Sequence, residues 1–390
     1  MPLSFNNTAL AYQAMTNRDL RRAYWLFRLV GSPLLVNAGR FFTETALAVH
    51  IPVEWMFRPT VFRHFCGGES IDGSMPTVNK MWQFGVGTIL DYAAEGAGNE
   101  AAYENTTTEI IKVIHKAATT KAIPFAVFKV SGMANTGLLE KMQAHMSLTT
   151  EEENEYERIE ERFDRICSEA FKCHVPLFVD AEESWIQDAV DRMALKAMRQ
   201  YNRQKCIVFN TVQLYRHDRL SYMQSLFDTG RNEGFKVGLK LVRGAYMEKE
   251  RTRAARLGYP SPIHKDKPAT DACFDEGVAL CLSHRDVVSF CLASHNEQSN
   301  LLLTTLMAQA QLPPDFPGIS SAQLLGMSDN ISYALAAAGY HVAKYVPYGR
   351  VKTVIPYLLR RAAENTSVAG QTGRELQGIT EEIRRRKRLK

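Results

Sequence analysis

Residues 175–184 read VPLFVDAEES, a short apolar run that ends in carboxylates, and this pattern predicts a buried strand. Seven further stretches share it: FGVGTILDYAAEG (84–96), IPFAVFKVSGM (123–133), CIVFNTVQLY (206–215), KVGLKLVRGAYM (236–247), DVVSFCLASHN (286–296), SAQLLGM (321–327) and HVAKYVPYG (341–349). Short apolar strands that alternate with helices indicate a parallel sheet buried on both faces. Eight such strands are the number that closes a barrel.

Helical stretches separate these runs. In residues 149–172 apolar side chains recur every three or four positions, and Thr149 with Glu152 forms a capping box at the start. The stretch NISYALAAAGY (330–340) closes on Gly339, which suits a left-handed helix cap. A doubly wound open sheet is the alternative fold, but nearly every run carries polar residues at its carboxyl end, where barrels build their sites. No Gly-x-Gly-x-x-Gly follows any strand, so a nucleotide cofactor would be held by other means.

The composition is that of a soluble globular protein: 390 residues, 45% hydrophobic and 23% charged. We expect an N-terminal helical arm at 1–80, a barrel at 81–370 and a basic tail at 371–390. Six of the last seven residues are Arg or Lys, and removing them from the net charge of +5 leaves −1. The basicity therefore belongs to the tail, which argues against a nucleic-acid partner. A solvated, frayed tail is the first interpretation, and weak attraction to anionic lipid is the second.

Cysteine and histidine spacing predicts no metal site. The seven cysteines show no Cys-x-x-Cys pair and the ten histidines no His-Glu-x-x-His pattern, which fits reduced thiols in a cytosol-like compartment. No run reaches the length of a membrane span. We expect a cytoplasmic location, with peripheral association at the inner membrane left open, and a mitochondrial location if the source is eukaryotic. The basic, amphipathic stretch MTNRDLRRAYWLFRLV (15–30) leaves a mitochondrial transit peptide and a structural helix both open.

Three charged residues are embedded in apolar strands: Lys129, Asp180 and Lys240. Buried charges persist only when they pair with one another or with a ligand, so the three together indicate a site. After the eighth strand, Arg360 and Arg361 would lie about 100° apart on a helix, where both can flank one planar anion. Glu364 follows Arg360 by one helical turn and can hold its guanidinium. A surface salt bridge is the alternative interpretation of this motif.

These stretches resemble the proline dehydrogenase family, flavin enzymes that oxidise proline to pyrroline-5-carboxylate, and come closest to its mitochondrial-type members. The matching segments are LDYAAEG, VFKVSG, VDAEES, FNTVQLY, KLVRGAYMEKERTRA, ASHNE, QLLGMSDNISYALAAAG and KYVPYGRVKTVIPYLLRRAAENTS, in family order over residues 85–366. The resemblance implies a distorted (β/α)8 TIM barrel of the α/β class, with its last helix over the barrel mouth. It also implies FAD as cofactor, L-proline as substrate, a quinone as electron acceptor and a separate dehydrogenase for the product.

The resemblance also assigns roles. Arg360 and Arg361 would bind the substrate carboxylate, oriented by ion pairs with Glu364 and Glu95. The polar side of the substrate pocket would be Lys129 and Asp180, and its walls Leu324, Tyr345, Ala245 and Tyr246. Lys240 would be the cation near flavin N5, to which the hydride passes from proline C5. The residues expected to hold FAD are Gln213, Lys240, Val242, Arg243, Gly244, Ala245, Ser294 and His295.

Two positions depart from the family pattern. Val212 stands where many relatives have tyrosine, and Met247 where some have tryptophan; both concern cofactor placement rather than the reaction. Tyr345 leaves little room for a 4-hydroxyl group, which favours proline over hydroxyproline. The alternatives are hydroxyproline oxidation, another imino-acid or folate-linked hydride transfer, and a binding module that has lost turnover.

Overall fold

The computed structural model describes residues 3–31, 54–93, 98–367 and 371–389. The side chains of residues 30, 360–367 and 371–372 are also outside the described residues.

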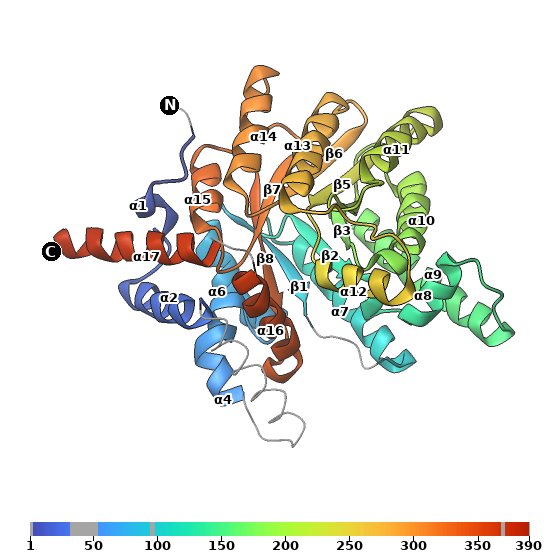
Figure 1. Ribbon diagram of the computed structural model, residues 1–390, viewed down its shortest axis with the longest axis horizontal. Helices are drawn as coiled ribbons and strands as arrows, with labels where there is room; N and C mark the ends of the chain where they lie inside the picture. Colours follow the sequence, from blue (N-terminus) through green and yellow to red (C-terminus); the bar gives the residue numbers. More distant parts are fainter. Residues whose placement is uncertain (1–2, 32–53, 94–97, 368–370, 390) are drawn as a thin grey trace. The chain divides into compact units, whose positions relative to one another are not determined.

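Eight parallel strands form a closed barrel in the order β1 to β8, so the barrel predicted from the sequence is confirmed and the open sheet is excluded. Strands β3, β4 and β8 are buried along their whole length, as strands covered on both faces should be. The strands, all but β4 labelled in Figure 1, are β1 (Gly87–Tyr92), β2 (Phe125–Lys129), β3 (Leu177–Asp180), β4 (Val208–Gln213), β5 (Val237–Val242), β6 (Val288–Ala293), β7 (Ile319–Leu324) and β8 (Val342–Tyr348).

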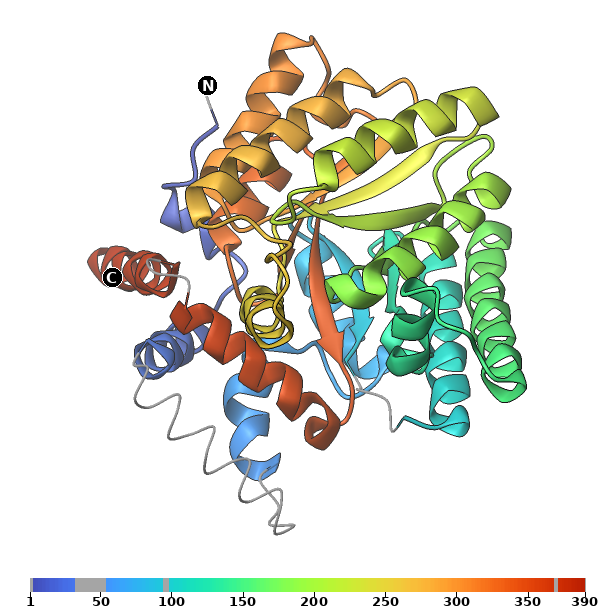
Figure 2. The ribbon, with the colours of Figure 1, turned by 45° about the vertical axis from the view of Figure 1, so that its right-hand side comes forward.

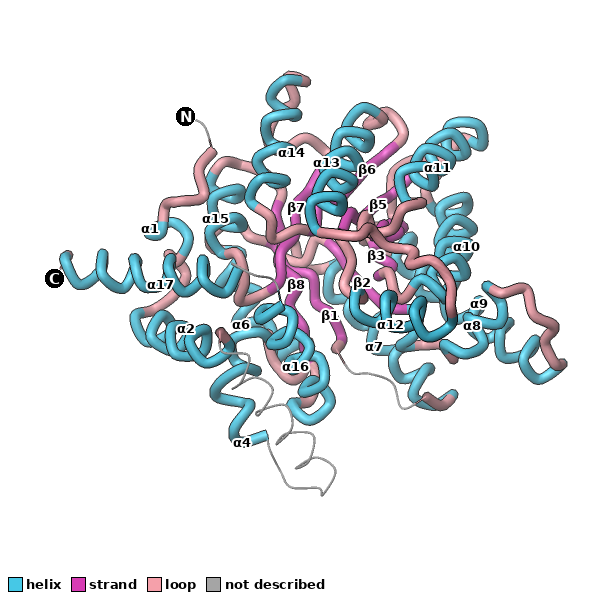
Figure 3. The backbone as a smooth tube through the Cα atoms, viewed as in Figure 1, coloured by secondary structure: helices cyan, strands magenta, loops and turns pink. Residues whose placement is uncertain are grey.

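The chain divides into two compact units. The first unit comprises residues 1–95, 323–338 and 342–390, and the second comprises 96–322 and 339–341. Figure 3 draws the helices in cyan and the strands in magenta. Helices of the second unit are α7 (Glu100–Ala118), η2 (Val130–Gly132), α8 (Thr136–Gln143), α9 (Thr150–Lys172), α10 (Ser184–Tyr201), α11 (Arg219–Glu233), α12 (Met247–Leu257), α13 (Lys267–Ser283) and α14 (Glu297–Gln309).

The second unit contains the predicted helix cap and an aromatic layer inside the barrel strands. Helix α9 begins after Thr149, whose side chain and that of Glu152 form the predicted capping box. Phe125 stacks on Phe178 with ring centroids 4.5 Å apart, and Phe209 meets Phe178 edge-on at 5.5 Å. These rings come from three neighbouring strands, so they fill the interior beneath the polar ends of those strands.

The first unit is mainly helical outside β1 and β8. Its helices are α1 (Thr8–Ala11), α2 (Asn17–Val30), α4 (Glu54–Phe57), η1 (Arg58–Phe62), α5 (Arg63–Phe65), α6 (Ile71–Trp82), α15 (Asp329–Ala337), α16 (Val351–Ser367) and α17 (Gln371–Arg388). Gly339, just after α15, has a φ of 86°, the left-handed conformation expected there. No helix among the described residues is long and apolar enough to span a bilayer.

The expected frayed tail is a helix instead. Residues 371–388 form α17, which lies beside α2, as the red and blue helices in Figure 2 show. Ile379 is fully buried against Leu20 and Phe27 of α2, and Leu376 and Ile383 pack on the same cluster. The expectation was wrong because the apolar side chains of α17 recur at helical spacing and bury one face, whatever the charge of the last turn.

Candidate active site

Three charged side chains meet at the carboxyl ends of β2, β3 and β5. Lys240 Nζ donates to Asp180 Oδ1, and Lys129 Nζ lies 3.3 Å from Asp180 Oδ2. The strand register explains both contacts. Lys129 and Asp180 are directly paired across β2 and β3. Asp180 and Lys240 lie on β3 and β5, alternate strands whose inward side chains share a layer in such barrels. The sequence left open whether these charges pair with one another or with a ligand; the distances show that they contact one another, and their roles remain predictions.

The cluster of Lys129, Asp180 and Lys240 is strongly desolvated on one side. Lys240 is only 4% exposed, and its ammonium lies 5.4 Å from the ring centroid of Phe178, within cation–π range. Burial would raise the pKa of Asp180, but the ammonium groups of Lys240 and Lys129 outweigh it and hold that pKa below its ordinary value. Asp180 is therefore an anion at neutral pH, and two ammonium groups face one carboxylate.

A second carboxyl group, Glu182, lies two residues beyond Asp180 and is 3% exposed. Its Oε2 accepts a hydrogen bond from Ser131 N at 2.8 Å, and its Oε1 accepts one from Ser131 Oγ. Burial raises the pKa of Glu182 to about 7, against the hydrogen bonds from Ser131. Burial, and then the charge of Glu182, also raise the pKa of Tyr246, which shows that this phenol shares the neighbourhood. Glu182 holds the turn that follows Lys129.

We expect Glu182→Gln to flatten the dependence of stability on pH. A carboxyl group whose pKa is raised on folding binds more protons in the folded than in the unfolded state, so its contribution is complete below about pH 4.5 and is lost as pH rises through about 7. In the wild type, the loss of this contribution between about pH 4.5 and about pH 7 lowers the free energy of unfolding by about 3 kcal/mol. Urea denaturation at pH 5 and pH 8 measures it, with the exposed Glu248→Gln as control. Equal pH dependence in wild type and Glu182→Gln would show that Glu182 does not titrate there.

The residues assigned to FAD at the ends of β4 and β5 include an unsatisfied amide. Gln213 is 2% exposed, and its Oε1 is buried with no hydrogen-bond partner among the described residues. Gln213 is paired in register with Val242, so β4 and β5 end together. Gly244, two residues on, has a φ of 138°, and a Cβ there would lie 2.5 Å from ring atoms of Tyr215. Only glycine permits this close approach of backbone to ring.

Arg243 links the ends of β5 and β6. Its guanidinium donates to Asp271 Oδ1 at 2.6 Å, Ser294 Oγ at 2.8 Å and Ser299 Oγ at 2.9 Å, and it lies 4.2 Å above the ring of Phe274. The structure thus brings together Arg243 and Ser294, two of the residues expected to hold FAD. It places Ala245 at an exposed position and His295, next to Ser294, at a partly buried one.

A cavity of about 550 Å³ opens beside these loops in the second unit. Backbone hydrogen bonds tie it to Tyr215, whose carbonyl accepts from His264 N at 2.7 Å. Ser261 Oγ and His264 Nε2 are buried and have no hydrogen-bond partner among the described residues. The cavity is lined by His217, Arg251, Ser261, Ile263, His264, Lys265 and Ala269, which include two cations, Arg251 and Lys265.

In the first unit, Leu324 and Tyr345 lie on β7 and β8, and Tyr345 O accepts a hydrogen bond from Leu325 N at 2.8 Å. Tyr345 is buried at 7% exposure. Beside it, Lys344 Nζ lies 2.7 Å from Asp329 Oδ1 and donates to Met327 O and Leu324 O. Lys344 therefore fixes the turn after Leu324.

The predicted carboxylate clamp lies outside the described residues. Arg360, Arg361 and Glu364 fall within α16, so the expected helix is present, but their side chains are outside the described residues. Glu95 is outside them altogether. The clamp and its ion pairs stay predictions.

Sequence reasoning missed several polar residues that organise the site. Lys344 gives the same signal as Lys129, a lysine between apolar neighbours in a strand, and could have been found by it. Arg243 donates to Asp271 and Ser299, which lie 28 and 56 residues away from it in sequence. No local sequence pattern marks either partner. Ser131 is likewise defined only by its contact with Glu182.

Comparison with known proteins agrees with the barrel and with these motifs. A family model described as proline dehydrogenase matches residues 74–374. "Proline dehydrogenase 1, mitochondrial" of Dictyostelium discoideum is 30% identical over 384 residues, which cover 87% of this chain and 67% of that protein. "Hydroxyproline dehydrogenase" of Xenopus laevis is 29% identical over 421 residues, with 98% of this chain and 90% of that protein covered.

A solved structure of proline utilization A from Bdellovibrio bacteriovorus has the same fold, with a TM-score of 0.72 at 17% identity. The match covers 92% of this chain but only 38% of that longer one. The family model matches most of the chain. The relative in Dictyostelium discoideum is 30% identical, and its match covers 87% of this chain. The chain therefore belongs to the proline dehydrogenase family.

Proposed function

We propose that this chain oxidises L-proline to 1-pyrroline-5-carboxylate, with FAD as the bound oxidant and a quinone as the final electron acceptor. The observation that carries the proposal is the charge cluster of Lys129, Asp180 and Lys240, the last two buried, at the carboxyl ends of barrel strands, in a chain of this family. A separate dehydrogenase would then oxidise the product.

The substrate would be held at both ends. Arg360 and Arg361 would bind the carboxylate, because two guanidinium groups on adjacent faces of a helix can form charge-assisted hydrogen bonds with one planar anion. Glu364 and Glu95 would orient them. Fixing the carboxylate aims the ring carbon C5, which lies at the other side of the nitrogen, at the oxidant. The ring would lie among Leu324, Tyr345, Ala245 and Tyr246.

The cluster of Lys129, Asp180 and Lys240 would supply the electrostatics. Its two ammonium groups and one carboxylate leave a net positive charge, which favours negative charge that develops beside it during the reaction. Proline reacts as the neutral amine: loss of hydride from C5 forms a C=N bond, and the nitrogen of the product is then an iminium. Lys129, which is 36% exposed at its side chain, would face the substrate, and Lys240 would face the cofactor.

The residues present fit FAD. The buried Oε1 of Gln213, which lacks a partner in the described part of the chain, would accept a hydrogen bond from a polar edge of the ring system, and Gly244 adds no side chain to the loop after β5. We assign the diphosphate and adenosine to this cavity of about 550 Å³, where Arg251 and Lys265 would pair with the phosphates and His264 would hydrogen-bond to them. Val242, Arg243, Ser294 and His295 complete the set. FAD would accept the hydride at N5.

A product assay tests the proposal. Protein loaded with FAD is incubated with L-proline and a soluble quinone analogue, and 1-pyrroline-5-carboxylate is trapped and measured with o-aminobenzaldehyde. We expect product that depends on both proline and FAD. Absence of product with correctly folded, FAD-loaded protein would reject this function and favour a binding module without turnover.

Hydroxyproline oxidation is the second candidate, because the relative in Xenopus laevis named for that reaction is almost as similar as the proline dehydrogenase of Dictyostelium discoideum. Identity alone does not separate the two. The choice depends on Tyr345, a buried side chain whose bulk would collide with a 4-hydroxyl group.

We expect the wild type to prefer L-proline to trans-4-hydroxy-L-proline in kcat/KM. Tyr345→Ser should shift that ratio toward hydroxyproline by about tenfold or more, because a shape mismatch in a pocket is worth roughly 1–3 kcal/mol. Tyr345→Phe keeps the ring and serves as control, with the wild-type ratio retained. A wild-type preference for hydroxyproline would contradict this use of Tyr345.

A further inference from the structure

The carboxyl ends of helices α7 and α9 bring an imidazole, a carboxylate and a thiol together. His115 lies in the last turn of α7, Glu169 lies in the last turn of α9, and Cys173 is the residue that caps α9. One nitrogen, one oxygen and one sulfur atom of these side chains all lie within 4.8 Å of one another. We call His115, Glu169 and Cys173 the α7–α9 cluster.

The distances within the α7–α9 cluster suit a small tetrahedral cation. His115 Nε2 lies 2.7 Å from Glu169 Oε1, and Cys173 Sγ lies 3.9 Å from the same oxygen. Ligands of a tetrahedral Zn²⁺ ion, with bonds of about 2.0–2.3 Å, lie roughly 3.3–3.6 Å from one another. The three donor atoms therefore reach such an arrangement by shifts of about 1 Å or less.

The chemistry of the donors selects among cations. Imidazole and thiolate are ligands that Zn²⁺ prefers, whereas Ca²⁺ and Mg²⁺ take oxygen ligands. Cys173 is partly exposed, and the other six cysteines of the chain are buried, so this thiol is the one that an ion in solution meets first. The carbonyl ends of α7 and α9 also carry partial negative charge, which favours a cation at the cluster.

A lysine beside the α7–α9 cluster competes for the same carboxylate. Lys172 Nζ lies 3.4 Å from Glu169 Oε2, and the side chain of Lys172 is 66% exposed. An exposed pair of this kind contributes little to stability, so the ammonium group moves aside at small cost. The other oxygen of Glu169, Oε1, is the one directed at His115 and Cys173.

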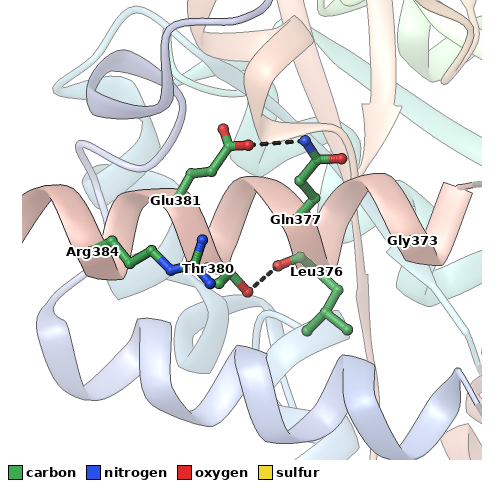
Figure 4. A pocket seen from close by; sticks show the side chains of 6 residues that line it. All are labelled: Gly373, Leu376, Gln377, Thr380, Glu381 and Arg384. Atoms are coloured by element: carbon green, nitrogen blue, oxygen red, sulfur yellow. Dashed lines mark hydrogen bonds between the residues drawn. The ribbon is translucent and has the colours of Figure 1, made fainter.

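A groove of about 390 Å³ on α17 shows the contrast (Figure 4). Gln377 Nε2 donates to Glu381 Oε1 at 2.9 Å, and Thr380 Oγ1 donates to a backbone carbonyl of the same helix at 2.6 Å. Its lining contains no histidine and no cysteine. In the part of the chain that the structure describes, the α7–α9 cluster is the one group of three His, Cys, Asp or Glu side chains with donor atoms this close.

We propose that the α7–α9 cluster binds one Zn²⁺ ion through His115, Glu169 and Cys173, with water as the fourth ligand. The thiol proton of Cys173 passes to solvent on binding, because the thiolate is the ligand, and nothing is oxidised or reduced. Sequence spacing could not predict this site, since 54 residues separate His115 from Glu169.

The zinc site lies away from the reaction. Helices α7 and α9 lead into β2 and β3, so their carboxyl ends lie at the amino-terminal face of the barrel. Lys129 and Asp180 lie at the opposite ends of these strands, on the face where such barrels place their chemistry. The ion clamps α7 to α9 and stabilises the second unit. This inference goes beyond the proposed oxidation of proline and does not depend on it.

A cobalt titration tests the zinc site without substrate, so its outcome is separate from that of the product assay. Tag-free, FAD-loaded protein is reduced, freed of metal with a chelator, and titrated with Co²⁺ and then Zn²⁺, and difference spectra remove the flavin bands. We expect one Co²⁺ per chain, with the visible absorption of four-coordinate Co²⁺ and a thiolate-to-cobalt band in the near ultraviolet. Zn²⁺ should displace both signals, and Mg²⁺ should displace neither.

Variants assign the ligands. Cys173→Ser should abolish the thiolate-to-cobalt band, and Cys173→Ser and His115→Gln should each weaken Zn²⁺ binding at least about 100-fold, because loss of even an outer-shell partner costs roughly 10- to 100-fold. Lys172→Gln should strengthen binding about two- to fivefold, since it removes the competing ammonium group. The control is His145→Asn, at an exposed histidine of the same unit, which should bind like wild type.

Thermal unfolding measures the clamp directly. Saturating Zn²⁺ should raise the Tm of the wild type by a few degrees and leave that of Cys173→Ser unchanged, because an ion that binds only the folded state stabilises it. The side chain of His115 is 55% exposed, so His115→Gln should fold like wild type and keep the comparison valid.

Three results would overturn the proposal. They are the absence of saturable Co²⁺ binding by the wild type, a thiolate-to-cobalt band that persists in Cys173→Ser, and wild-type affinity for Zn²⁺ in both Cys173→Ser and His115→Gln. In each case the contact between His115 and Glu169 is an ordinary surface ion pair.

Discussion

Asp180→Asn is expected to lower the free energy of unfolding by about 3–5 kcal/mol and kcat/KM for proline at least about 100-fold. The reason lies in Lys240, which is buried against the carboxylate and has its ammonium over the ring of Phe178. Asparagine keeps the shape but removes the charge, so a buried ammonium loses its counterion. Urea denaturation and steady-state kinetics measure the two effects.

The loss of stability in Asp180→Asn should depend on pH in a defined direction. Since the pKa of Asp180 is depressed in the folded state, its stabilising contribution is present above about pH 4 and is lost as pH falls further. The stability gap between wild type and Asp180→Asn should therefore narrow in acid. Asp286→Asn is the matched control, because its pair with Arg231 is exposed and should contribute less than about 1 kcal/mol.

A double variant separates stability from catalysis. Lys240→Met added to Asp180→Asn removes the uncompensated charge, and we expect much of the lost stability to return while activity stays low. If activity returned together with stability, the charge cluster would be a folding element rather than part of the site. Unchanged stability of Asp180→Asn would contradict the pairing itself.

Arg361→Met or Arg360→Met is expected to raise KM for proline by about 30-fold to several thousandfold. Loss of one partner from a desolvated, charge-paired contact costs about 2–5 kcal/mol, and each 1.4 kcal/mol is tenfold. Lys352→Met, on the exposed first turn of α16, should keep the wild-type KM.

An uncharged substrate analogue shows whether the loss concerns the carboxylate. The affinity of wild type for L-prolinamide should already be low, and Arg361→Met should change it little, because the amide offers no negative charge to pair with. Equal losses for proline and prolinamide would show that the arginine supports the fold of α16 instead. A wild-type KM in both arginine variants would show that neither Arg360 nor Arg361 binds the substrate carboxylate.

The strands could be read from sequence because each is an apolar run with its polar residues at one end. All eight were located. The cost of burying Lys129, Asp180 and Lys240 alone predicted a partner for each charge, but it left open whether that partner was another of the three or a ligand. The capping box at Thr149 was visible for a similar reason, since its hydrogen bonds join residues three positions apart.

The rest depends on contacts between distant residues. The hydrogen bonds between Ser131 and Glu182 join residues 51 positions apart, and no sequence pattern near either residue predicts them. Helix α17 was mistaken for a frayed tail because charge alone was counted, although Leu376, Ile379 and Ile383 already had helical spacing. Exposure of Trp25 could not be foreseen, since a tryptophan in an amphipathic helix normally marks the buried face.

The most direct test is the absorption spectrum of the purified, FAD-loaded protein before and after L-proline is added without oxygen. The account predicts a yellow protein whose visible flavin bands bleach with proline, in the wild type and far more weakly in Asp180→Asn at equal proline. A protein that takes up no FAD, or a bound flavin that proline leaves fully oxidised, would contradict it.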